Sequence, residues 1–189
     1  MKKIPIILAA ILILFVSCAK PPTEEMNKAI ETLIRAENDP DALIYAGNTL
    51  NRARESLLRM QEEAGSKRYE TAKTYAADVI IYAERAVNEG RANAARARDE
   101  AAGLLDSLRI PLTETESILN TARTNNIQLD FNDLETSLDS ARNSYEDAKS
   151  SLSANDFEDA INRGQSARSA LSAVNAEINE AAQALSGKK

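Results

Sequence analysis

The chain has 189 residues, with 23 Lys or Arg against 29 Asp or Glu, which gives a net charge of −6. An acidic surface disfavours binding to nucleic acid and to anionic lipid headgroups, because both repel carboxylates. Histidine is absent and only one cysteine is present, which excludes Ser-His-Asp and Cys-His catalysis, an internal disulfide and the usual zinc sites. We therefore expect neither an enzyme nor a cofactor.

Residues 1–17 have the layout of a secretory signal peptide. Lys2 and Lys3 are followed by an almost wholly apolar stretch over residues 4–16, which is shorter than the roughly 20 residues that span a bilayer. The sequence Phe-Val-Ser-Cys that ends at Cys18 resembles a lipobox, with Phe where the common form has Leu, as in the relaxed lipoboxes of spirochaetal lipoproteins. This resemblance predicts cleavage after Ser17.

The resemblance further implies that Cys18 carries a diacylglycerol thioether and, after cleavage, an acylated amine. Two or three acyl chains at ~0.8 kcal/mol per buried CH₂ anchor a protein stably, whereas one chain binds only marginally. Ala19 lacks the aspartate that retains enterobacterial lipoproteins at the inner membrane, so we expect the outer membrane, facing the periplasm or exposed at the cell surface. The alternatives are a free buried cysteine or an ordinary signal peptide.

Residues 18–23 are expected to form the lipidated cysteine and a tether that contains two prolines, and residues 24–110 a first three-helix unit. Its helices are predicted over residues 24–37, 40–64 and 67–108. The boundary signals are the N-caps Thr23, Asp39 and Ser66, the C-terminal stop Gly65 and the break at Ile110-Pro111.

A second three-helix unit is predicted over residues 111–186, with residues 187–189 as a tail. Its helices are expected to end near residues 125, 152 and 185. Thr113 and Glu116 have the spacing of a capping box for the first helix, and Asp156 is placed to cap the last one.

Apolar residues recur at alternating steps of three and four, which predicts packed helices. The four stripes begin Leu43, Ala46, Leu50, Ala53; Tyr69, Ala72, Ala76, Val79; Phe131, Leu134, Leu138, Ala141; and Phe157, Ala160, Gly164, Ala167. Adding 88 to the numbers of the first two stripes gives the last two. The sequence therefore predicts an all-α fold of duplicated units built on long antiparallel hairpins, with tetratricopeptide-like or helical-bundle packing.

The pattern L-x-x-A-R, followed by a helix that starts Y/F-E-x-A, resembles a family of bacterial envelope proteins of uncharacterised function. The matching residues are Leu50, Ala53, Arg54, Tyr69 and Ala72, then Leu138, Ala141, Arg142, Phe157 and Ala160. The family consists of small Ala-rich helical domains, often in lipoproteins and sometimes fused to an outer-membrane peptidoglycan-binding domain. The resemblance implies a location and a shape but no activity, and we expect no peptidoglycan-binding domain in this chain.

Three groups of side chains are candidate sites, each with a plainer structural explanation. The acidic clusters Asp39/Asp41, Glu62/Glu63, Asp99/Glu100 and Asp156/Glu158/Asp159 lack calcium-loop spacing, and most lie at predicted helix ends. The basic stretch Arg91, Arg96 and Arg98 has neighbouring carboxylates, so intrahelical pairs are expected. The tyrosines Tyr45, Tyr75 and Tyr82 are expected to pack over the first helix. The alternative is that they line a groove.

The leading functional hypothesis is a lipid-anchored helical scaffold that binds another protein of the cell envelope. The alternative is a structural spacer or tether between the outer membrane and peptidoglycan, for which Lys188 and Lys189 are candidate contacts, although a solvated tail is favoured. A third hypothesis is an apolar ligand bound between the two units. Self-association through the apolar seams stays open.

Overall fold

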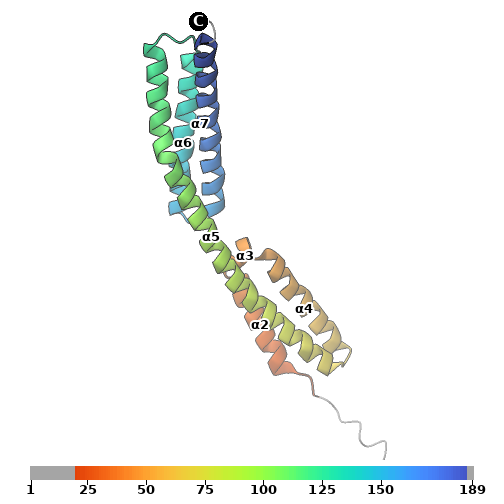
Figure 1. Cartoon of the computed structure of the whole chain (residues 1–189). Helices are drawn as coiled ribbons and strands as arrows, with labels where there is room; N and C mark the ends of the chain where they lie inside the picture. Colours follow the sequence, from red (N-terminus) through yellow and green to blue (C-terminus); the bar gives the residue numbers. More distant parts are fainter. Residues whose placement is uncertain (1–19, 187–189) are drawn as a thin grey trace, which may run out of the picture. The chain divides into compact units, whose positions relative to one another are not determined.

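The computed structural model describes residues 20–186, and within that range the chain is helical and contains no strand (Figure 1). The all-α prediction is confirmed. The helices are α2 (Thr23–Glu37), α3 (Pro40–Tyr45), α4 (Gly47–Gly65), α5 (Tyr69–Thr124), α6 (Phe131–Ser153) and α7 (Phe157–Ser186). Cleavage after Ser17, lipidation of Cys18 and the tail at 187–189 lie outside the described residues.

The chain forms two compact units that meet between Arg91 and Ala92, inside α5. The sequence instead predicts this boundary at residues 110 and 111, because Pro111 is a local signal for the end of a helix. Each unit has its own apolar core, and each is described separately below.

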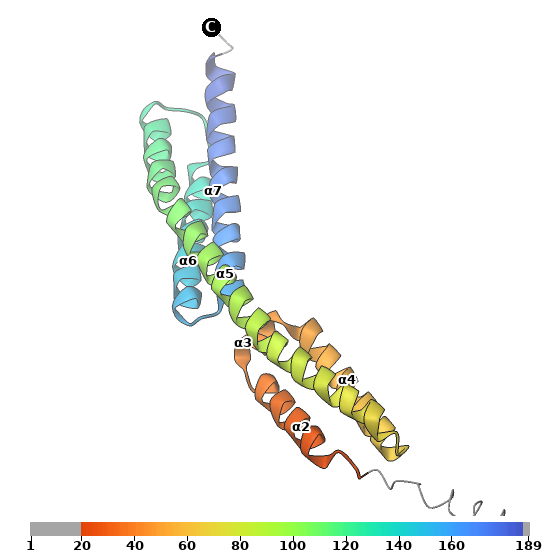
Figure 2. The same ribbon diagram turned by 60° about the horizontal axis from the view of Figure 1, so that its bottom comes forward.

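In the first unit, α2, α4 and the N-terminal part of α5 pack together (Figure 2). The core between them is mostly alanine. Eight of its twelve buried residues are alanines, so the helix backbones approach closely. The buried members are Ala29, Leu33, Ala36, Ala42, Ala46, Leu50, Ala53, Met60, Ala76, Val79, Ala83 and Ala86. The seam predicted for the start of α5 is therefore confirmed.

The predicted helix over residues 40–64 is interrupted at Ala46, whose φ of −134° and ψ of 28° lie outside the helical region. Asp39 caps the short helix α3 by accepting a hydrogen bond from the Ala42 backbone nitrogen at 3.0 Å, as predicted. Because the chain changes direction at Ala46, Leu43 leaves the predicted seam and stays 49% exposed. Gly47 follows the interruption, and glycine is a weak helix former.

In the second unit, the C-terminal part of α5, α6 and α7 form a three-helix bundle, with α6 and α7 side by side in both views (Figures 1 and 2). Larger side chains fill this core than the first. The buried members are Leu108, Leu112, Leu119, Ala122, Leu134, Leu138, Ala141, Ala167, Leu171, Val174 and Ile178.

The predicted helix break at Ile110-Pro111 is wrong, because α5 continues through Pro111. An interior proline costs about 3 kcal/mol. Leu108, Leu112 and Leu119 are buried on one face on both sides of it, and burial stabilises each such side chain by about 1.5–3 kcal/mol. Packing therefore outweighs the proline. The capping box at Thr113 does not form, since the Thr113 hydroxyl donates to the Ile110 carbonyl within the helix at 2.8 Å.

Three helices end in the same way, with a residue in the left-handed conformation just beyond the helix. These residues are Lys67 (φ 60°), Asn126 (φ 54°) and Asn155 (φ 61°). The α4 helix ends at Gly65 as predicted, but Gly65 is not the left-handed residue, and the predicted cap Ser66 lies in the turn before α5 begins.

The remaining predicted caps have different outcomes. The Asp156 carboxylate accepts from the Asp159 backbone nitrogen at 3.1 Å, which confirms this cap of α7. Thr23 does not cap α2, because it is the first helical residue and follows Pro22. Sequence reasoning missed the cap Asp130, which accepts from two backbone nitrogens at the start of α6.

Candidate functional site

Two helical hairpins are formed by α4 with the start of α5 and by α6 with α7. The residues of the repeated L-x-x-A-R and Y/F-E-x-A patterns lie in the seams of these hairpins. The buried ones are Leu50, Ala53, Ala72, Leu138, Ala141, Phe157 and Ala160, and Tyr69 is half-buried. Packing against the partner helix explains the small and apolar residue types at these positions. The pattern therefore accounts for hairpin structure and identifies no reactive group.

The two arginines of the pattern form ion pairs between helices. Arg54 on α4 lies 2.7 Å from Glu37 at the end of α2, and Arg142 on α6 lies 2.9 Å from Glu116 on α5. Both arginine side chains are 44% exposed, and exposed pairs of this kind contribute about 0–1 kcal/mol. These pairs tie neighbouring helices together within each unit.

Two of the acidic clusters, Glu62/Glu63 and Asp156/Glu158/Asp159, lie at the hairpin turns. In each of them a carboxylate accepts local hydrogen bonds. Arg68 donates to Glu63, with Nη2 2.8 Å from Oε1, and this hydrogen bond lowers the pKa of Glu63. Asp159 accepts from the Ser151 hydroxyl and from Arg163, each at 2.5 Å, and these hydrogen bonds lower the pKa of Asp159. Within residues 20–186, no group of three or more Asp, Glu, Cys or His side chains is placed to hold a metal ion.

The expectation of an intrahelical partner for Arg91 is wrong. Its guanidinium pairs with Asp39, at the start of α3, at 3.4 Å. The partner lies on another element because the start of α3 packs against α5 beside Gly90. Arg96 donates to Asn93 on its own helix at 3.1 Å.

The tyrosines of the first unit are partly buried. Tyr75 and Tyr82 pack against the alanine-rich core, which agrees with the expected covering role. Arg59 donates a hydrogen bond to Tyr75 that raises the pKa of the guanidinium, and Arg85 lies 5.7 Å from the centre of the Tyr82 ring. Tyr45 is half-buried.

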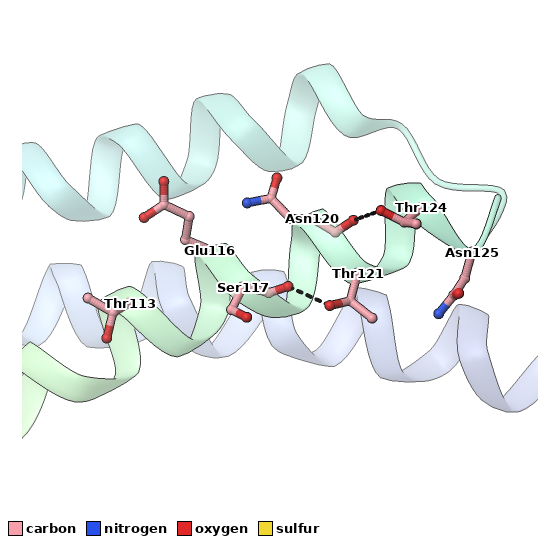
Figure 3. A pocket seen from close by; sticks show the side chains of 7 residues that line it. All are labelled: Thr113, Glu116, Ser117, Asn120, Thr121, Thr124 and Asn125. Atoms are coloured by element: carbon pink, nitrogen blue, oxygen red, sulfur yellow. Dashed lines mark hydrogen bonds between the residues drawn. The ribbon is translucent and has the colours of Figure 1, made fainter.

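An open polar groove of about 470 Å³ runs along the exposed face of α5 in the second unit (Figure 3). It is lined by Thr113, Glu116, Ser117, Asn120, Thr121, Thr124 and Asn125. The Thr121 and Thr124 hydroxyls donate to the carbonyls of Ser117 and Asn120 at 2.8 and 2.9 Å, as the dashed lines show. These donors are used within the helix, which weakens the groove as a binding site.

A second groove, of about 320 Å³, lies in the first unit between α2 and α5. Its floor includes Ala36, Ala83 and the half-buried Val87. Polar residues surround this floor, namely Thr32, Arg35, Asp39, Glu84, Asn88 and Arg91. Sequence reasoning missed this groove because its two sides are about 50 residues apart in the chain, and no local spacing connects them.

Among the residues whose burial the structure describes, large exposed apolar side chains are concentrated in the first unit. They are Ile34, Leu43, Ile44, Leu58 and Ile81, against Ile110 and Ile118 in the second unit. Single exposed apolar residues are normal on protein surfaces. Their uneven distribution makes the first unit the better candidate for contacts with another protein.

No family model, curated protein or solved structure matches this chain. The resemblance to Ala-rich envelope lipoproteins stays a prediction. In the part of the chain that the structure describes, no helix has the length and apolar character needed to cross a membrane.

Proposed function

We propose that this protein is a lipoprotein of the bacterial cell envelope, anchored by acyl chains on Cys18, whose helical units bind another envelope protein. The observation that carries the anchor is the position of the single cysteine, directly after a basic and apolar leader and a small residue. Ala19 supports outer-membrane placement, by analogy with enterobacterial sorting.

Metabolic labelling with palmitate tests the anchor. The wild-type chain should incorporate label and enter the detergent phase on phase separation, whereas Cys18→Ser should do neither. Ser66→Ala is a suitable control, because Ser66 lies in a turn far along the sequence from the leader. Equal labelling of Cys18→Ser and the wild type would exclude lipidation at this residue.

The partner-binding part of the proposal is supported by the exposed apolar side chains of the first unit and by the absence of histidine and of a second cysteine from the sequence. In-cell crosslinking with mass spectrometry should recover a reproducible envelope protein. Leu58→Glu and Ile81→Glu should reduce its yield, whereas Ile118→Glu in the second unit should not. If neither substitution in the first unit changes the yield, the partner does not bind through this surface.

A spacer between the outer membrane and peptidoglycan is a second candidate. The continuity of α5 through Pro111 favours a spacer role. Under tension a continuous helix keeps its length better than a flexible loop does. Digestion of peptidoglycan should then release the protein from the wall fraction. A protein that never sediments with the wall would contradict this alternative.

We also propose that the two hairpins arose by duplication. The helices on each side of the turns support this, since α4 and α6 end at Gly65 and Ser153, and α5 and α7 begin at Tyr69 and Phe157, in each case 88 residues apart. The left-handed residues Lys67 and Asn155 have the same separation.

A further inference from the structure

In the groove between α2 and α5, opposite charges surround an apolar floor. At one end, Arg91 and Asp39 pair with each other at 3.4 Å. Arg35 on α2 and Glu84 on α5 carry the other two charges. Within residues 20–186, neither of these two side chains forms an ion pair, so each is available to a ligand.

Arg35 is oriented by its own helix. Its Nη2 atom approaches the Thr32 hydroxyl oxygen at 3.4 Å, and the Thr32 hydroxyl in turn donates to the Lys28 carbonyl at 2.8 Å. Thr32 is only 5% exposed, so this support is fixed by packing. Most guanidinium donors of Arg35 remain unused, and guanidinium is the side chain best suited to a planar carboxylate.

Two charged residues of the groove, Glu84 and Arg91, have no charged counterpart at the corresponding positions of α7. In α7, the positions 88 residues after Ala83, Glu84 and Arg91 are Leu171, Ser172 and Asn179. Leu171 is 3% exposed and belongs to the core of the second unit, whereas Ala83 lines the groove in the first unit. By contrast, the position 88 residues after Arg35 is Arg123, which pairs with Glu135 at 2.5 Å.

We propose that this groove binds a small zwitterion, an amino acid or a short peptide, whose carboxylate pairs with Arg35 and whose ammonium group pairs with Glu84. The apolar floor of Ala36, Ala83 and Val87 contacts the carbon atoms between the two charges. A volume of about 320 Å³ lies at the small end of ligand pockets, which suits a ligand of this size.

Isothermal titration calorimetry on the full-length protein in detergent tests the proposal with three probes. These are L-alanine, L-alanyl-L-alanine and the same dipeptide with an acetylated amine and an amidated carboxylate. We expect saturable binding of a free-ended probe and none of the capped dipeptide. Tighter binding of the dipeptide identifies peptide termini as the target, and tighter binding of alanine identifies the amino acid. Absence of saturable binding, or equal binding of the capped probe, overturns the proposal.

Arg35→Gln and Glu84→Gln should each weaken binding by about tenfold or more, because each removes one charge-assisted contact. Both side chains are exposed, so circular dichroism should show unchanged helix content. Arg52→Gln and Glu55→Gln on α4 change the same residue types outside the groove and should leave binding unchanged. Equal losses in all four variants would overturn the assignment.

Zwitterion binding in the groove requires neither the lipid anchor nor a protein partner. Cys18→Ser should bind the free-ended probe as the wild type does. Failure of lipidation would therefore leave the groove proposal standing, and failure of zwitterion binding would leave the lipoprotein proposal standing.

Discussion

Gly90 of α5 lies directly against the backbone of Ala42 in α3. A Cβ atom placed on Gly90 would come within 2.6 Å of the Ala42 nitrogen, closer than real Cβ atoms approach backbone. The backbone cannot swing away as a long side chain can. Only glycine therefore allows α3 to pack at this position.

Gly90→Ala should lower the free energy of unfolding by about 1–3 kcal/mol, since the added methyl group overpacks the contact with α3. Gly103→Ala is the matched control on the same helix, because no atom lies within 4 Å of its added Cβ. Gly103→Ala should raise stability by about 0.5–1 kcal/mol through helix propensity. Urea denaturation followed by circular dichroism measures both. Equal effects of the two substitutions would contradict the close packing at Gly90.

Pro111→Ala should stabilise the second unit by about 1–3 kcal/mol. The substitution restores a backbone N–H and removes the clash of the ring with the preceding turn, while the loss of a half-buried ring offsets part of the gain. Thermal unfolding should show a higher midpoint. A lower midpoint would mean that the proline ring contributes more through packing than it costs the helix.

Lys67→Gly should stabilise the first hairpin by about 1 kcal/mol, because Lys67 has a φ of 60° and glycine adopts this conformation without strain. Asn155→Gly at the corresponding turn should give a smaller gain, since asparagine tolerates the left-handed region better than lysine. Urea midpoints of the two variants test this order. A larger gain at Asn155 would reverse it.

Asp159 should contribute to stability in a pH-dependent way. Hydrogen bonds from Ser151 and then Arg163 lower its pKa below the ordinary 3.8, so the folded state favours the carboxylate. Its contribution is therefore present above pH 3.8 and is lost as the pH falls through the lowered folded value.

The melting temperature of Asp159→Asn should lie below that of the wild type at neutral pH. The difference should shrink as the pH falls below 3.8 and through the lowered folded value. Asp99→Asn removes an exposed carboxylate outside this network and is the control. A difference for Asp159→Asn that does not change with pH would show that the carboxylate charge is not responsible.

The features that the sequence predicted well depend on local physical chemistry. Periodic apolar spacing gave the seams at Leu50 and Leu138, and short polar side chains before a helix gave the caps Asp39 and Asp156. These signals need only neighbours within a few turns. Most helix ends could therefore be located to within a few residues.

The features that the sequence could not predict depend on tertiary packing. Pro111 is a strong local signal for a helix break, yet leucines on both sides of it are buried in one core. Rules that consider only neighbouring residues cannot predict that burial. The same holds for the groove, because Arg35 and Glu84 face one hollow only after α2 and α5 have packed.

The alanine-rich core of the first unit has a thermodynamic consequence. Each buried alanine removes little apolar surface from water, and the heat capacity change of unfolding scales with that surface. The first unit should therefore have a smaller heat capacity change per residue than the leucine-rich second unit. A small heat capacity change flattens the dependence of stability on temperature, so the first unit would lose relatively little stability in the cold.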